Sequence, residues 1–170
     1  SFLGYGGFPG TICASVDEVV VHGFPSDKRL EEGQLLSIDC GLVYKGWQAD
    51  AARTLYVGEV SEEKRLLTET TKESFFKGVE QFKDGNRLGD ISHAIQQYCE
   101  ERGYGVVRSM VGHGIGREMH EDPPVPNFGK AGHGVKLQTG MVLAIEPMIN
   151  LGTWQTVEKG WSCTTLDKKP

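Results

Sequence analysis

Two strand-forming stretches joined by a two-residue turn are the feature that most constrains how this chain folds. Residues 35–44 and 47–57 are rich in β-forming side chains, and Lys45-Gly46 between them fits a tight hairpin turn. Counting back from this turn pairs Tyr44 with Trp47 and fixes the other pairs along the two strands. We therefore expect a long antiparallel hairpin whose two faces can be assigned from the sequence.

Around the hairpin, the sequence predicts two helices and further strands. Ser61 fits a helix N-cap, and the apolar side chains behind it keep helical spacing until Asp84-Gly85 interrupts the pattern. A second helix is expected from about Leu88, ending at Gly103. A hairpin, two helices and further strands make an α+β domain with α/β sandwich-like layers. The further strands are expected at residues 105–109, 140–147 and 161–165.

Length and composition place the chain among ordinary globular domains. Its 170 residues fit a single domain over residues 1–170, with 38% hydrophobic and 24% charged side chains. No apolar run approaches the ~20 residues of a membrane-spanning helix. The net charge is −5 and the 18 Lys and Arg residues are scattered, so we expect no nucleic-acid surface and no membrane partner.

The cysteines indicate a reducing compartment. The chain has four, Cys13, Cys40, Cys99 and Cys163, without a C-x-x-C pair, and a domain of this size needs no disulfide framework. We therefore expect free thiols in a cytoplasmic protein. The chain starts at Ser1 with no signal peptide, and its first residues have the character of the middle of a domain.

Asp39 and Asp50 form the first candidate site. The hairpin register places them on one sheet face as diagonal neighbours, and both have apolar flanks such as Ile38 and Ala51. Two strand carboxylates are most often simply solvated, but in a half-buried strand they are costly unless they are paired or bind a metal. No lysine or arginine alternates opposite them, so a divalent metal ion is the simplest partner.

A glycine-rich segment, Gly112-His113-Gly114-Ile115-Gly116, followed closely by His120, forms the second candidate site. A glycine-rich loop can bind phosphates, but that function needs a following helix, which Pro123-Pro124 disfavours. A lone histidine is more often a hydrogen-bonded core residue, whereas two histidines in one glycine-lined loop favour a site. Glycines on both sides of His113 would let both backbone and a ligand approach it closely.

Glu146 ends an apolar strand just before a proline, a position that suits an edge residue, a carboxylate ligand or a general base. With Asp39, Asp50 and His113 it makes an oxygen-rich set containing one imidazole, which suits Mn, Fe(II), Co or Zn. Two carboxylates able to bridge predict two divalent metal ions that activate a water between them. His22, taken alone, has the surroundings of an ordinary turn histidine.

These residues lie in four motifs that resemble type I methionine aminopeptidases in order and spacing, over essentially the whole chain. The motifs are Val-Val-Val-His22-Gly-Phe-Pro, Ser-Ile-Asp39-Cys-Gly with Ala-Asp50 behind it, Val-Gly-His113-Gly-Ile-Gly-Arg-Glu-Met-His120-Glu, and Ala-Ile-Glu146-Pro-Met. The resemblance implies the pita-bread fold, with pseudo-twofold halves around a two-metal site. It also implies removal of the initiator methionine from nascent chains when the second residue is small.

The resemblance further implies a role for each site residue. Asp50 would bridge both metal ions, and Glu146 would also act as general base toward the attacking water. His22 would hydrogen-bond the scissile amide and help its nitrogen to leave, while His120 would polarise the carbonyl. The implied metal ligands are Asp39, Asp50, His113 and Glu146. The implied methionine pocket combines apolar, aromatic and sulfur groups, from Tyr5, Phe8, Cys13, Met119 and Trp161.

Parts of the family pattern fall outside this chain. The family carries a fifth ligand, a bridging glutamate, just beyond the segment that ends at Pro170, and a further portion ahead of Ser1. We therefore expect a partial catalytic domain, truncated at both ends, from a monomeric cytoplasmic enzyme that acts near the ribosome. The position of Met119 is often aromatic in the family, so the pocket is expected to differ in detail.

Two other functions stay open. A related Xaa-Pro aminopeptidase or prolidase would use the same metal ligands, but the 33-residue gap between His113 and Glu146 favours the methionine enzyme. A non-catalytic binding module on the same fold would have lost ligands that this chain retains. Type II relatives are disfavoured because the stretch from Glu146 to Trp161 leaves little room for their helical insertion.

Overall fold

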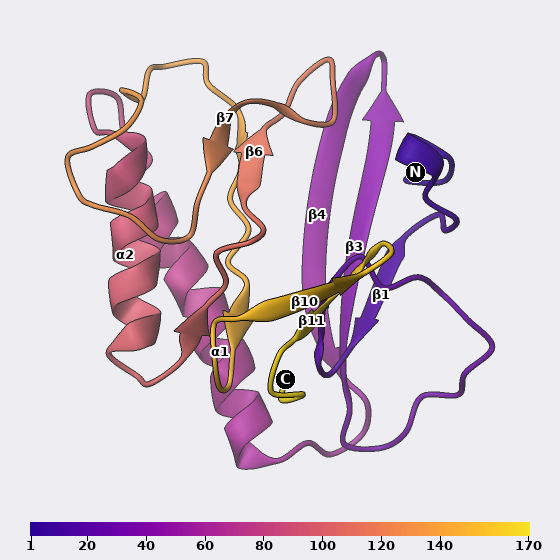
Figure 1. The fold of residues 1–170 in the computed structure, drawn as a ribbon. Helices are drawn as coiled ribbons and strands as arrows, with labels where there is room; N and C mark the ends of the chain where they lie inside the picture. The colour runs from indigo at the N-terminus through magenta and orange to yellow at the C-terminus, as the bar shows by residue number, and fades with distance from the viewer.

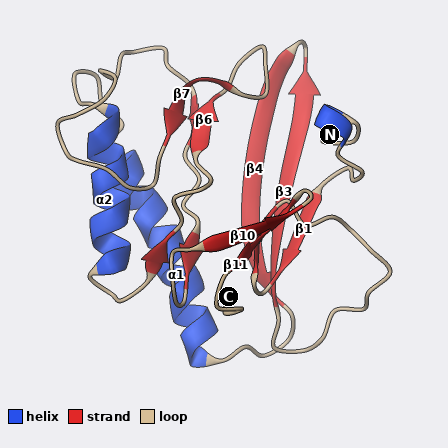
Figure 2. Cartoon of the chain, viewed as in Figure 1, coloured by secondary structure: helices blue, strands red, loops and turns tan.

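Two helices lie beside a long antiparallel hairpin and a set of shorter antiparallel strands in the computed structural model, which describes residues 1–170 (Figures 1 and 2). The strands form four sheets in the orders β1-β3-β4, β10-β11-β2, β7-β6-β8 and β5-β9. The elements are η1 (Tyr5–Gly7), β1 (Cys13–Val16), β2 (Val19–Val21), β3 (Leu35–Tyr44), β4 (Trp47–Tyr56), α1 (Glu62–Val79), α2 (Leu88–Glu100), β5 (Gly105–Val106), β6 (Gly112–Gly114), β7 (Glu121–Val125), β8 (Leu143–Ala144), β9 (Ile149–Asn150), β10 (Thr156–Lys159) and β11 (Ser162–Thr165).

The predicted hairpin is confirmed in its register. β3 and β4 pair antiparallel over ten residues each, with Gly41 opposite Asp50 and Asp39 opposite Ala52. The two turn residues between the strands have φ values of 51° and 79°, as a type I′ hairpin turn requires. The two aspartates therefore lie diagonally on one face of the hairpin, as the sequence predicted.

The predicted helices are also confirmed, and together they make the main core. The Ser61 hydroxyl caps α1 by accepting a hydrogen bond from the Lys64 backbone N–H at 3.3 Å. Both helices end slightly before the predicted limits, α1 at Val79 and α2 at Glu100. Fully or almost fully buried side chains join the helices to the strands behind them, among them Leu67, Ile91, Ile95, Cys99, Val106, Val125 and Leu137.

Other strand predictions were correct in place but wrong in extent. The strand expected at 161–165 is present as β11, whereas those expected at 105–109 and 140–147 shrink to β5 and β8, of two residues each. The segment expected to be a glycine-rich loop contains the strand β6. β6 has no strand-favouring sequence, and its extended form follows from hydrogen bonding to β7 on one side and β8 on the other.

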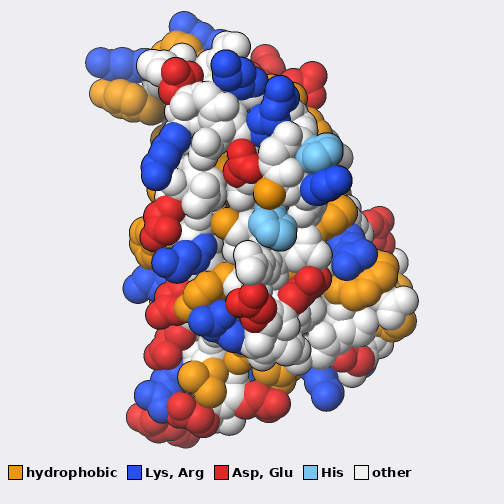
Figure 3. All heavy atoms as spheres, turned by 90° about the vertical axis from the view of Figure 1, so that its left-hand side faces the viewer, with side chains coloured by type: hydrophobic (Ala, Val, Ile, Leu, Met, Phe, Trp, Pro, Cys, Tyr) orange, Lys and Arg blue, Asp and Glu red, His pale blue; other side chains and the backbone are white.

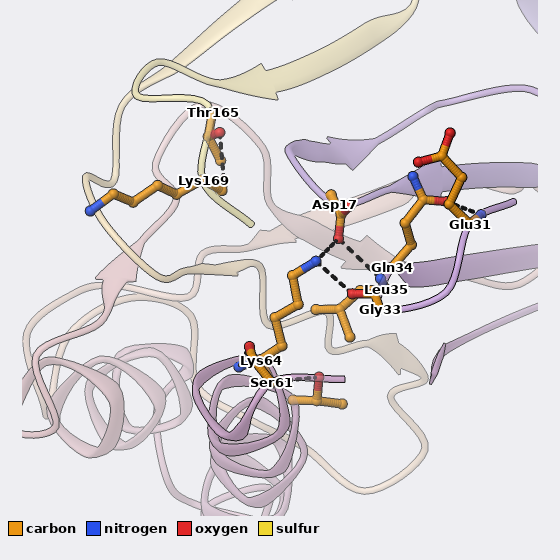
Figure 4. A network of polar contacts seen from close by, with 10 residues as sticks. Asp17, Glu31, Gly33, Gln34, Leu35, Ser61, Lys64, Thr165 and Lys169 are labelled. Carbon is orange, nitrogen blue, oxygen red and sulfur yellow. Dashed lines mark hydrogen bonds and ion pairs between the residues drawn. The ribbon is translucent and has the colours of Figure 1, made fainter. Parts of the chain in front are cut away.

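Polar contacts tie the first turn of α1 to the turn between β1 and β2 (Figure 4). The Lys64 ammonium group donates to Asp17 Oδ1 at 2.7 Å and to the Gly33 carbonyl at 2.8 Å. Asp17 Oδ1 also accepts the Leu35 backbone N–H at 3.0 Å. The Lys64 and Asp17 side chains are only 20% and 19% exposed, so this ion pair anchors the start of β3 to the helices.

The surface carries charges of both signs. On the face shown in Figure 3, Lys and Arg side chains are interspersed with Asp and Glu side chains, without a broad area of one sign. Neither helix has the length and apolar character needed to cross a membrane.

Candidate metal centre

Four strands from two sheets meet at the candidate site. Asp39 lies on β3 and Asp50 on β4, His113 lies at the middle of β6, and Glu146 follows β8 by two residues. His113 is opposite Ala144 in the β6–β8 pair, which brings the segment carrying Glu146 alongside the histidine. The sequence-predicted ligands therefore converge although they span more than a hundred residues of chain.

Three of the predicted ligands form a tight group. Ligand atoms of Asp50, His113 and Glu146 all lie within 4.8 Å of one another. His113 Nε2 is 3.2 Å from Glu146 Oε1 and 3.6 Å from Asp50 Oδ2. Asp39 is not part of this group of three, but its carboxyl group neighbours that of Asp50. Among the charged groups around Asp39, Asp50 has the largest effect on its pKa.

The hydrogen bonds of His113 orient the ring for cation binding. Its Nδ1 lies 2.8 Å from the Gly114 carbonyl oxygen, which can only accept, so Nδ1 carries a proton. Nε2 then points at two carboxylates, where it must either hold a second proton or share a cation with them. A ring nitrogen fixed by a backbone carbonyl on its far side is typical of histidine metal ligands.

Two carboxylate oxygens at the site are buried without a regular hydrogen bond: Asp39 Oδ1 has no partner, and Glu146 Oε1 has only the ion-pair contact with His113 Nε2 at 3.2 Å. Buried polar atoms are almost always paired, and an unpaired charged one is especially costly. A divalent cation bound by these oxygens and by His113 Nε2 would satisfy both of them. The residues present therefore fit a divalent metal ion of the kind that accepts oxygen and imidazole ligands.

The pKa shifts at the site also indicate that its carboxylates lack a compensating positive charge. Burial and the adjacent Asp50 carboxyl raise the pKa of Asp39 to about 8. Burial disfavours the charged form of His113, but the Asp50 and Glu146 carboxylates outweigh it and raise the pKa of His113 to about 10. Burial also acts against ionised Asp50, yet its hydrogen bond with His113 lowers the pKa of Asp50. Without a cation, the site retains protons that a metal ion would displace.

Of the other two predicted catalytic histidines, His120 borders this group. His120 follows β6 in the loop before β7, and its ring centroid is 4.2 Å from that of His113. Its Nδ1 is 2.7 Å from the Tyr5 hydroxyl. Partial burial and the neighbouring His113 lower the pKa of His120. His22 follows β2 in a left-handed conformation with φ of 60°, which is uncommon for a residue other than glycine and occurs often at functional sites.

The residues predicted to bind a methionine side chain gather between the hairpin and the N-terminal turn. Phe8, Cys13 and Met119 are buried in one cluster, together with Phe2 and Ile115. Tyr5 and Trp161 are partly exposed, 48% and 39%, and Trp161 meets Phe8 edge to face at a centroid distance of 5.5 Å. Sequence reasoning missed Phe2, because a single phenylalanine carries no signal of its own.

Cys13 is both a residue of the predicted methionine pocket and a neighbour of the site carboxylates. It pairs with Asp39 across the β1–β3 ladder. Burial, followed by the charges of Asp39 and Asp50, raises the pKa of the Cys13 thiol to about 12. The thiol therefore stays protonated and acts as a small apolar group.

An open hollow gives access to the histidines. Its volume is about 450 Å³, and it is lined by Val111, Gly112, His113, His120, Glu121, Asp122 and Pro124. The lining includes two histidines and two acidic residues, so the hollow offers hydrogen-bonding groups to a bound peptide backbone.

The glycines beside His113 permit the close approach of neighbouring backbone that the sequence predicted. A Cβ atom on Gly112 would collide with the carbonyl oxygen of Ala144, and one on Gly114 with the carbonyl oxygen of Asp122. The glycines let the backbones of β8 and β7 approach β6 closely, which confirms the prediction for the backbone. The approach of a ligand to His113 stays a prediction.

Asn127 is a site residue that the sequence did not indicate. It is fully buried, and its Nδ2 donates a hydrogen bond to the backbone carbonyl of Glu146 at 2.7 Å. Its Oδ1 has no partner. The side chain thus fixes the backbone of a predicted ligand from a segment 19 residues away in the sequence.

Comparison with known proteins identifies strong relatives. Residues 3–165 match the family described as "Metallopeptidase family M24". The chain is 59% identical to "Methionine aminopeptidase" of Clostridium acetobutylicum, over 98% of this chain and 68% of that protein. It is 47% identical to "Methionine aminopeptidase 1" of Bacillus subtilis, over 99% of this chain and 69% of that protein.

Solved structures agree with the sequence relatives. The crystal structure of methionine aminopeptidase from Thermotoga maritima superposes with a TM-score of 0.97 at 48% identity, covering 99% of this chain and 69% of that chain. A prolidase from Pyrococcus furiosus superposes less closely, with a TM-score of 0.72 at 27% identity, covering 94% of this chain and 49% of that chain.

Proposed function

The chain belongs to metallopeptidase family M24 and has its pita-bread fold, and from this premise we propose that it removes the N-terminal methionine from peptides and nascent proteins. It is a metal-dependent hydrolase, as the family is. The observation that carries the proposal is the group of Asp50, His113 and Glu146, within 4.8 Å of one another. A second residue with a small side chain is the expected preference.

The proposed centre holds two divalent ions. Asp39, Asp50, His113 and Glu146 are the residues that would hold them. The unpaired Asp39 Oδ1 supports a second ion, because one ion among Asp50, His113 and Glu146 would leave this oxygen without a partner. The ligand chemistry admits Mn, Fe(II), Co or Zn.

The chain's own residues then divide the work of peptide hydrolysis. When bound, the metal ions supply the Lewis acidity that activates a water toward the peptide carbonyl. Glu146, at the end of the ligand group, takes the proton from the attacking water as general base. His120, neutral because its pKa is lowered, donates a hydrogen bond to the carbonyl oxygen. His22 holds the amide nitrogen and helps it to leave.

The proposed methionine pocket is the apolar cluster beside the hairpin. Phe8, Cys13 and Met119 form its buried floor and Trp161 and Tyr5 its rim. A protonated thiol, a thioether and aromatic rings are soft, polarisable surfaces that suit a methionine side chain. The lining therefore favours an unbranched, sulfur-containing side chain over a charged one.

We further propose residues 1–170 as a single catalytic domain, partial with respect to its relatives. The partner is the N-terminus of a nascent polypeptide, near the ribosome in the cytoplasm, bound by a monomer without nucleic-acid or membrane contacts. An Xaa-Pro hydrolase is the second candidate, since prolidases share the fold. The lower similarity to the Pyrococcus furiosus prolidase, 27% against 59% identity to a methionine aminopeptidase, disfavours it.

The test is release of methionine from Met-Ala-Ser, compared with cleavage of Xaa-Pro peptides. Metal-stripped full-length protein would be reloaded with Mn, Co or Fe(II) and each peptide assayed. Asp50→Asn is the inactive variant, and Asp84→Asn, in the turn between α1 and α2, is its matched control. We expect metal-dependent release from the methionine peptide only. Preference for Xaa-Pro peptides would establish the second candidate, and folded, metal-loaded protein that cleaves neither would indicate a non-catalytic module.

A further inference from the structure

The only hydrogen bond of the His120 ring in this structure joins Nδ1 to the Tyr5 hydroxyl, at 2.7 Å. The two rings are tilted by 36° with centroids 5.5 Å apart, so they meet at their polar edges rather than stacking face to face. Tyr5 was assigned above only to the rim of the methionine pocket. Its hydroxyl has a separate partner, and that partner is a proposed catalytic group.

Both partners are held in place by their own backbones. Tyr5 lies in the short turn η1, where its N–H donates to the Phe2 carbonyl and its own carbonyl accepts from the Phe8 N–H, each at 2.9 Å. Phe2 and Phe8 are both buried, so the turn is anchored in the apolar cluster.

The loop carrying His120 is anchored to the hairpin. The Gln48 N–H donates to the Gly116 carbonyl at 2.8 Å, and the Arg117 guanidinium lies over the Trp47 ring at 4.0 Å. The Tyr5–His120 contact therefore connects two fixed segments and does not depend on a flexible side chain finding its partner.

A neutral imidazole carries one proton, and its two nitrogens then differ: one donates and the other accepts. If the Tyr5 hydroxyl donates to Nδ1, the ring proton is on Nε2, and Nε2–H is free to donate to a peptide carbonyl. If Nδ1 carries the proton, Nε2 is an acceptor and repels that carbonyl oxygen. The hydrogen bond to Tyr5 therefore determines whether His120 can perform its proposed role.

We propose that Tyr5 is a positioning residue for the reaction: its hydroxyl donates to His120 Nδ1 and so keeps the proton on Nε2, facing the substrate carbonyl. This inference deepens the proposed function and rests on it for the identity of the carbonyl. The tautomer of His120 is a property of the protein alone, so that part of the inference does not depend on the proposed function.

The tautomer can be measured directly. Full-length protein labelled with nitrogen-15 and loaded with diamagnetic Zn would be examined by long-range proton–nitrogen correlation spectra, with His120→Gln identifying the His120 signals. We expect the Nε2–H form in the unmodified protein and a mixture or the Nδ1–H form in Tyr5→Phe, which keeps the ring and removes only the oxygen. His113, whose Nδ1 faces the Gly114 carbonyl, serves as an internal reference that should not change.

Kinetics separate positioning from pocket lining. Loss of one hydrogen bond predicts a drop in kcat of about three- to tenfold for Met-Ala-Ser in Tyr5→Phe, with KM little changed, because the ring that would contact methionine is retained. Tyr98→Phe removes the equivalent atom from a hydroxyl that binds Glu73 on the helices, and it should leave both constants unchanged.

An unchanged His120 tautomer in Tyr5→Phe, or the Nδ1–H form in the unmodified protein, would overturn the inference. A rise in KM at constant kcat would assign Tyr5 to the pocket alone and would also overturn it. If the unmodified protein released no methionine, the proposed function would fail, while the spectra would still decide the tautomer.

Discussion

Replacing Asn127 by alanine should weaken both the fold and metal binding. The substitution removes the 2.7 Å hydrogen bond to the Glu146 carbonyl at a fully buried position. A buried carbonyl left without its donor costs about 1–3 kcal/mol, and the small cavity adds to this. We expect a loss of about 3 kcal/mol in the free energy of unfolding, or roughly 6–12 °C in Tm. Because Glu146 is a proposed ligand, metal affinity should fall by about 10- to 100-fold, as when other groups that orient a metal ligand are removed.

The assay pairs urea unfolding of the metal-free protein with calorimetric titration of Mn. Asn150→Ala is the matched control: Asn150 is equally buried and donates to the Thr153 carbonyl at 2.8 Å, outside the segment that carries a ligand. It should lose similar stability and keep its Mn affinity. The reasoning would be refuted if Asn127→Ala bound Mn as tightly as the unmodified protein, or if both variants lost affinity equally.

Three further predictions concern stability. In metal-free protein, the pKa is raised from 3.8 to about 8 for Asp39 and from 6.5 to about 10 for His113. Because both groups bind protons more tightly in the folded state, the free energy of unfolding should decrease as the pH rises from 5 to 9. Saturating Mn should flatten this pH dependence in urea titrations. Lys64→Met leaves the largely buried Asp17 without its cation and should cost about 2 kcal/mol; a double-mutant cycle with Asp17→Asn should recover part of this, and full additivity would contradict the pairing. Gly114→Ala forces a collision with the backbone of β7 and should cost at least ~2 kcal/mol while lowering Mn affinity through His113; wild-type stability would show that the strands can separate freely.

The hairpin and the two helices could be predicted because their signals are local. A turn of two residues fixes the β3–β4 register, and that register alone places Asp39 and Asp50 on one face. Capping by Ser61 and the spacing of apolar residues locate α1 in the same way. In each of these cases the residues that determine the structure lie within a few positions of one another.

The strands around His113 could not be predicted, since their cause is not local. β6 consists of Gly-His-Gly and becomes extended only because β7 and β8 hydrogen-bond to it from both sides. Two-residue strands such as β8 leave no periodic pattern in the sequence. The sequence therefore indicated the candidate residues and placed Asp39 beside Asp50, but it did not predict how His113 and Glu146 join them.

Residues that carry the chemistry of a site are easier to predict from a sequence than the residues that position them. Carboxylates and histidines flanked by apolar residues stand out because burying them needs an explanation. The supporting residues, two glycines that permit close strand approach, Asn127 behind Glu146 and Tyr5 behind His120, have ordinary roles in most proteins. Their roles become visible only in the folded chain. There, close backbone packing or a single hydrogen bond connects each of them to a proposed ligand or catalytic group. Variants of these supporting residues therefore test the site more stringently than removal of the ligands, because they keep every reacting group and change only its position or its proton.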